Sequence, residues 1–236
     1  MSARPGRTAV AIDGPVQTIE DVIARMTAID ESLPPNDGVA YFNQLYLAVT
    51  KAVQEGVRGM QFEDARFLSR LDVVFANLYF QALAAADAGT LVSPAWRPLF
   101  AAREHQRCPV QFALCGMNAH INHDLPLAVT KTADELKAEL ISSSPQHRDF
   151  MSVNQLLAQV EPEVKTWFVK GLIADVDRVI GDEGDKLAMW SIADARELAW
   201  RHAGTLWSLR EHPHLEKAYI ETLSALVHLA GRGILI

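Results

Sequence analysis

The sequence predicts an all-α fold: a single-domain, irregular bundle of about eight to nine helices around a central Pro-kinked helix. Three observations support this. Apolar residues recur at helical spacing through most of the chain. No sustained period-two alternation occurs, and no Asn-Gly or Asp-Gly hairpin joins β-branched runs. No linker long enough to separate two domains interrupts residues 1–236, of which 1–16 are expected to form a flexible N-terminus.

Capping residues and helix breakers mark the first three helices. The segment 17–33 has Thr18 as a candidate N-cap with Asp21 three residues later, and it stops before two prolines. The segment 37–56 carries apolar residues at helical spacing and ends on a glycine. The longer segment 62–89 has one broad apolar stripe and also ends on a glycine, as helices often do.

The second half of the chain is expected to be helical as well. A short helix is predicted around 95–105, and the central helix from Pro109 to about Thr130. The stretch "SSSPQH" at 142–147 is the clearest loop. Further helices, separated by proline and glycine, are expected at 149–159, 162–180, 186–211 and 214–230.

Composition narrows the classes of protein that remain. With 49% hydrophobic residues among 236, the chain is rich enough to fold into a globular domain. The formal charge of −7 and the lack of a Lys/Arg cluster argue against a nucleic-acid partner. Neither a secretory signal nor a membrane-spanning stretch is evident, so a cytoplasmic location is expected. Cys108 and Cys115 lie about 10 Å apart along one helix, which predicts free thiols.

The stretch "CGMNAHINHDLP" at 115–126 places many polar groups in an otherwise apolar helix. His120 and Asp124 are four residues apart and share a face, with His123 about 60° to one side. Asn118 and Asn122 form a second pair of the same spacing on another face. Such a helix lies inside a bundle, where its polar groups need partners or a cavity.

Pro126 is expected to bend this helix. Its ring displaces the carbonyl of Asn122 and removes the hydrogen bond that this carbonyl would accept. The freed carbonyl would lie beside His123 and Asp124, where it would need water, a cation or a ligand.

Four interpretations of the polar cluster remain open. His120 and Asp124 have the spacing of two metal ligands, with His123 as a third. The same two residues suit a general acid/base dyad. The cluster could instead hydrogen-bond a polar ligand, with Asn118 and Asn122 as substrate-binding groups. The fourth interpretation is a buried polar network that joins helices.

Other helices supply polar residues that are candidates for the same site. Asp72 is flanked by apolar residues, so its carboxyl needs a cation or belongs to a site. Arg196 is the best candidate partner for that carboxylate or for an anionic substrate group. Tyr79 and Trp200 are candidates for substrate binding, although such aromatic residues more often pack in a core. The remaining hydrogen-bonding groups on apolar helices are expected to be structural: Tyr46, Thr50 and Asn77.

The polar stretch also resembles a known family. "GMNAHINHDLPLA", together with "LDVVFANLYFQAL" and "WSIADARELAWRHAGTLW", is similar to an uncharacterised, mostly actinobacterial family of all-helical domains over about residues 38–210. The resemblance implies a helical fold and no established activity. The family pattern G-M-N-x-H-I-N-x-D-L and its flanks match this chain at Asn118, His120, Asn122, Asp124, Asp72, Asn77 and Arg196. His123 and Pro126 stand where the family more often has Leu and Gly, which weighs against His123 as an essential ligand.

These observations together predict an enzyme acting on a small, partly apolar molecule. His120 would be the acid/base or first metal ligand, Asp124 its partner, Asp72 a second carboxylate and Arg196 a substrate anchor. Two carboxylates, a histidine and a freed carbonyl favour a divalent metal and hydrolase-like chemistry. One alternative is a metal-free isomerase, lyase or cyclase that uses the His120–Asp124 dyad. The other is a non-catalytic ligand-binding or interaction protein.

Overall fold

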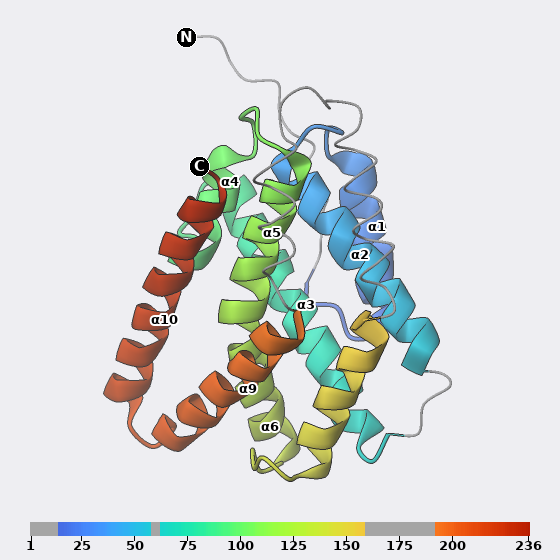
Figure 1. Ribbon diagram of the computed structural model, residues 1–236, viewed down its shortest axis with the longest axis vertical. Helices are drawn as coiled ribbons and strands as arrows, with labels where there is room; N and C mark the ends of the chain where they lie inside the picture. Colours follow the sequence, from blue (N-terminus) through green and yellow to red (C-terminus); the bar gives the residue numbers. More distant parts are fainter. Residues whose placement is uncertain (1–13, 58–61, 159–191) are drawn as a thin grey trace.

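The computed structural model describes residues 14–57, 62–158 and 192–236, and all regular secondary structure in these ranges is helical. The all-α prediction is therefore confirmed. Figure 1 shows the helices gathered around one central pair, α5 and α6, with α10 on one flank and α1 on the other. The expected flexible N-terminus lies largely outside the described residues. Val16, at its end, is buried and exchanges two backbone hydrogen bonds with the amide of Asn77.

The first three helices follow their sequence signals closely. Helix α1 (Ile19–Ser32) begins with a reciprocal capping box between Thr18 and Asp21. Helix α2 (Gly38–Val57) follows, and α3 (Ala65–Asp87) begins at Asp64, whose side chain accepts a hydrogen bond from the Phe67 amide. Gly89 adopts a φ of 66° just beyond α3, where glycine is favoured.

The central helix is divided by a π turn. A short 3₁₀ helix, η1 (Pro94–Trp96), and α4 (Arg97–Ala102) precede α5 (Pro109–Ala119). The π turn η2 (His120–Asp124) then leads into α6 (Leu125–Leu136). Within it the Leu125 amide bonds to the His120 carbonyl, five residues back. Pro126 thus occupies the first turn of a new helix, where a missing N–H is tolerated.

The last helices depart from prediction at their boundaries. The loop expected at 142–147 is a turn at 142–144, and a helix already begins at residue 145 and continues to 158. Proline is tolerated at its first position, which explains the early start. Helix α9 (Ile192–Leu209) and α10 (Pro213–Ile234) complete the bundle. The helix predicted at 162–180, and the start of the one predicted at 186–211, lie outside the described residues.

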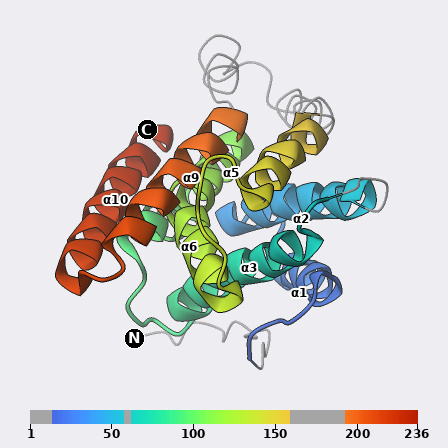
Figure 2. The same cartoon turned by 90° about the horizontal axis from the view of Figure 1, so that it is seen from below.

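The packing places the central helix in contact with most of the bundle. Helix α5 packs between α2 and α10, and α6 packs between α3 and α9. Figure 2 shows α6 in the middle of this arrangement. Gly116 lets α2 approach α5 closely, because a Cβ atom at this position would lie 2.3 Å from the Phe42 ring.

The structure also bears on the cysteines and on membrane-spanning helices. Both cysteines are free thiols, as predicted, and Cys115 is buried with its pKa raised to about 12 by burial. In the described part of the chain no helix is both long enough and apolar enough to cross a membrane.

A buried ion pair fixes the start of α2, since Asp37 caps the Val39 amide and contacts the Arg103 guanidinium at 2.8 Å.

Candidate functional site

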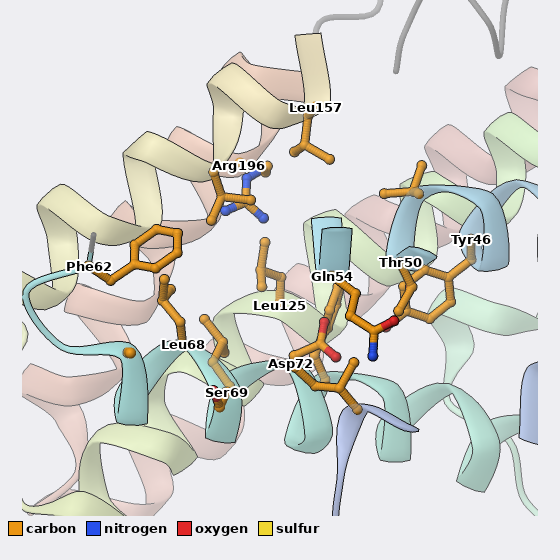
Figure 3. A pocket seen from close by; sticks show the side chains of 16 residues that line it. Tyr46, Thr50, Gln54, Phe62, Leu68, Ser69, Asp72, Leu125, Leu157 and Arg196 are labelled. Carbon is orange, nitrogen blue, oxygen red and sulfur yellow. The ribbon is translucent and has the colours of Figure 1, made fainter. Parts of the chain in front are cut away.

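A cavity of about 120 Å³ lies between α2, α3, α9 and the helix at 145–158. Figure 3 shows the side chains that line it. Its walls are mostly apolar, formed by residues that include Val49, Phe62, Leu68, Leu71, Phe75, Leu125, Val153 and Leu157. This volume is somewhat smaller than that of an engineered cavity of about 150 Å³ that binds benzene. The cavity therefore suits a molecule of about one small ring.

Three buried polar atoms at this cavity have no hydrogen-bond partner among the described residues. They are the hydroxyl oxygens of Tyr46 and Thr50 and the Oδ2 atom of Asp72. Tyr46 and Thr50 lie four residues apart on α2, so both side chains point the same way, and Asp72 faces them from α3. Buried polar atoms in folded proteins are nearly always satisfied. Three such atoms at one cavity make it the candidate site in the described part of the chain.

Asp72 supplies the carboxyl group in the lining of the cavity. Burial raises the pKa of its carboxyl to about 6, against an ordinary value of 3.8, and the positive charge of Arg196 opposes this rise. The Asp72 charge in turn helps to raise the pKa of Tyr46, which burial already raises strongly. A carboxyl with a pKa near neutrality in a cavity is typical of a general base or a ligand-binding group.

Arg196 lies across the cavity from Asp72 (Figure 3). Its Nε donates to the Asn154 side chain at 2.7 Å, and its Nη2 donates to the Phe150 carbonyl at 2.9 Å. Its guanidinium also lies 4.2 Å from the Phe150 ring centroid. Burial lowers the pKa of Arg196 to about 10, and Asp72 opposes this effect. The side chain is thus held rigidly at the cavity wall while its charge complements Asp72.

The Asp124 carboxylate is the centre of a second polar group. Its Oδ2 accepts hydrogen bonds from Trp96 Nε1 at 3.0 Å and faces His120 Nδ1 at 3.2 Å. Its Oδ1 lies 2.7 Å from His123 Nδ1. Burial raises the pKa of Asp124, but the hydrogen bonds from His120 and His123 outweigh it and hold the pKa below its ordinary value. Asp124 is therefore ionised, and both imidazoles present an Nδ1–H to it.

His120 is separated from the cavity by Phe75. The two rings stack with their centroids 3.5 Å apart and their planes within 6°. Phe75 lines the cavity, whereas His120 and Asp124 do not. Burial lowers the pKa of His120, partly offset by Asp124, and its Nε2 has no partner in the described chain. The residues expected to form one site therefore form two, with Asp72 and Arg196 at the cavity and His120 and Asp124 behind its wall.

The other predicted site residues take up structural contacts. Asn118 donates to the Val227 carbonyl of α10, and Asn122 donates to Asn118, so this pair joins α5 to α10. The Tyr79 hydroxyl lies 3.3 Å from Asn43 Oδ1 in the core. Trp200 packs against Phe150 and is buried away from the cavity lining. None of these four side chains contributes to the cavity, although each was a candidate for substrate binding.

A metal site at His120, Asp124 and His123 stays a prediction. Across the described ranges, no group of three or more His, Cys, Asp or Glu side chains could hold a metal ion. His120 and His123 both direct Nδ1 at the Asp124 carboxylate, so each oxygen of this carboxylate already has an imidazole partner.

Sequence reasoning missed the role of Tyr46 and Thr50, which it treated as structural. Their i, i+4 spacing on an apolar helix was the available signal, but only the three-dimensional packing brings them to Asp72. It also missed Ser93, whose hydroxyl lies 3.4 Å from His123 Nε2.

Comparisons with known proteins give a family and no activity. A model described as a family of unknown function (DUF5995) matches residues 19–236. No curated protein and no solved structure gives a significant match.

Proposed function

The chain belongs to the family of unknown function DUF5995, and we propose that it binds a small, mostly apolar molecule carrying a hydroxyl or amino group. The observation that carries this proposal is the convergence of three unpartnered buried polar atoms, on Tyr46, Thr50 and Asp72, at one apolar cavity. A donor on the ligand would bond to the Asp72 carboxylate. The apolar part of the ligand, a small ring, would pack against the apolar walls of the cavity.

The charges at the cavity support this ligand class. Asp72 and Arg196 offset each other, so a neutral ligand needs no extra counter-charge. A hydrogen bond to a charged group contributes about 1.5–3 kcal/mol, which corresponds to roughly a tenfold or greater gain in affinity. The cavity is therefore expected to discriminate between molecules of equal shape that differ only in a donor group.

Phenol and toluene provide the matched pair, because they differ only by a hydroxyl in place of a methyl group. Titration calorimetry should give at least about tenfold tighter binding for phenol than for toluene. Asp72→Asn should remove most of this preference, because it removes the charged acceptor. Asp134→Asn, at a largely exposed carboxylate of α6, is the control and should leave the preference unchanged. Equal binding of phenol and toluene by the unmodified chain would contradict the proposal.

A second candidate function is acid/base catalysis on the same ligand class, with Asp72 as the general base. It rests on the raised pKa of about 6 together with the unpartnered Oδ2 atom. Arg196 and the Tyr46 hydroxyl are the donors that would face a substrate carbonyl. The metal-free dyad of His120 and Asp124 is disfavoured, because Phe75 stands between it and the cavity.

Proton exchange separates this second function from simple binding. Cyclopentanone, a small apolar ketone, would be incubated with the protein in deuterated water and its α-hydrogens followed by NMR. Catalysis predicts exchange that saturates with ketone and is lost in Asp72→Asn. Binding of phenol without any such exchange would assign the cavity to a ligand-binding protein.

A further inference from the structure

A chain of hydrogen bonds links the Asp124 carboxylate to Ser93, and none of its members lines the cavity. Asp124 Oδ1 lies 2.7 Å from His123 Nδ1, and His123 Nε2 lies 3.4 Å from Ser93 Oγ. The order carboxylate, imidazole and hydroxyl is that of a Ser-His-Asp triad, which is recognised by geometry and not by sequence position. A serine–histidine distance of this size is common before substrate binds.

The donor and the acceptor of each hydrogen bond between Asp124 and Ser224 can be worked out from the neighbouring groups. Ionised Asp124 can only accept, so His123 holds its proton on Nδ1 and presents a lone pair at Nε2. Ser93 can then donate to Nε2 and accept from the Ser224 hydroxyl, 3.2 Å away. Ser224 in turn accepts from the Ala95 amide at 3.3 Å. With these donors and acceptors, the Ser93 proton points at the imidazole, as a nucleophile activated by a base requires.

The backbone supports this arrangement at both ends. Ser93 occupies the N-cap of η1 but makes no capping bond there, although serine at this position usually does. His123 and Asp124 lie in the π turn, a rare geometry that occurs often at functional sites. Ser93 is partly exposed, whereas His123 and Asp124 are buried. Ser93 is therefore the member of this chain of hydrogen bonds that has exposed surface.

We propose that Ser93 is a nucleophile activated by His123, with Asp124 orienting the imidazole, and that it reacts with small carboxylic esters. The Ser93 oxygen would attack the ester carbonyl carbon as its proton passes to His123 Nε2. The bond to the leaving alkoxide then breaks, and the alkoxide takes the proton to leave as an alcohol. Water, deprotonated by His123, would attack the acyl carbon. The bond from that carbon to the Ser93 oxygen then breaks, this oxygen takes the proton back from His123, and the carboxylic acid is released.

The test is covalent labelling of the full chain with a fluorophosphonate, which phosphonylates activated serines and releases fluoride. The modified residue would be located by peptide mass spectrometry over a time course. Ser142 and Ser143 serve as internal controls, because they are exposed on the turn after α6 and neither hydroxyl has a hydrogen bond to a histidine among the described residues. The proposal predicts labelling of Ser93 at least tenfold faster than of either control. In His123→Leu the rate should fall by about 10²-fold or more, as expected for loss of a general base.

Three results would overturn the proposal. Ser93 could label no faster than Ser142 and Ser143, which would assign the hydrogen-bond chain to holding η1 against α10. The label could sit on Ser224. A folded His123→Leu variant, checked by circular dichroism, could label at the unmodified rate. The first two results come from the unmodified chain, so they decide the matter even where the variant does not fold.

Discussion

Asp72→Asn is expected to stabilise the protein, and to do so more at high pH than at low pH. The carboxyl is buried at the cavity with its Oδ2 unpartnered, and its pKa is raised from 3.8 to about 6. The folded chain therefore holds a proton on Asp72 over a pH range where the unfolded chain has lost it. The free energy of unfolding of the unmodified chain must therefore fall as the pH rises from about 4 to about 6, and it should level off above pH 6.

The size of this pH-dependent change in stability follows from the two pKa values of Asp72, about 6 in the folded chain and 3.8 in the unfolded chain. A difference of about two pKa units at 1.36 kcal/mol each gives a cost of about 3 kcal/mol above pH 7. At pH 5 the folded carboxyl is mostly protonated while the unfolded one is mostly ionised, so only about half of this cost is present. An asparagine at this position also lacks partners, but its cost does not change with pH. The advantage of Asp72→Asn should therefore grow by about 1–1.5 kcal/mol between pH 5 and pH 8.

Urea unfolding followed by circular dichroism at pH 5, 6, 7 and 8 measures this difference directly. Asp134→Asn is the control, because its carboxylate is largely exposed and is expected to show no such trend. A difference between Asp72→Asn and the unmodified chain that stays constant across this range would refute the reasoning. It would mean that the Asp72 carboxyl is solvated and is not available as a buried binding group.

Three further substitutions test the packing around the site by urea unfolding. Phe75→Ala removes the wall between the cavity and His120 and should lower the free energy of unfolding by about 3–5 kcal/mol. A loss below about 1 kcal/mol would mean that the stacked rings of Phe75 and His120 do not form this wall. Arg103→Ala should cost about 3–5 kcal/mol because it leaves a buried carboxylate unpaired, whereas Arg70→Ala, at a partly exposed pair, should cost less than about 1 kcal/mol. Equal losses would contradict the burial of the first pair. Gly116→Ala should destabilise the protein by about 1–3 kcal/mol, because the new Cβ would overlap the Phe42 ring. Gly204→Ala has open space around its Cβ and should stabilise the protein by up to about 1 kcal/mol. The opposite order would contradict the close packing of α2 on α5.

The local features of the fold were accessible from sequence because they depend on neighbours one helical turn apart. The capping box of Thr18 and Asp21, the His120–Asp124 contact and the Asn118–Asn122 contact all follow from fixed helical spacing. The start of the helix at residue 145 was missed because proline fits the first turn of a helix as readily as it ends one.

The division of the predicted site in two could not be read from sequence, because it depends on contacts between distant residues. Phe75 is one of several aromatic residues at helical spacing on α3, and nothing in its spacing shows that it stacks on His120. Ser93 likewise lies 30 residues from His123, in a connection that looked unremarkable. Helical periodicity predicts which face of a helix is buried, but not which other helix covers it.

The most direct test of the central claim is a crystal structure of the protein with phenol bound. We expect the phenol ring in the cavity between Phe75 and Leu125, with its hydroxyl within hydrogen-bonding distance of Asp72 Oδ2. Crystals of Asp72→Asn treated in the same way should show markedly lower phenol occupancy. Phenol bound elsewhere on the protein, or bound in the cavity with its hydroxyl turned away from Asp72, Tyr46 and Thr50, would contradict the assignment of this cavity as the binding site.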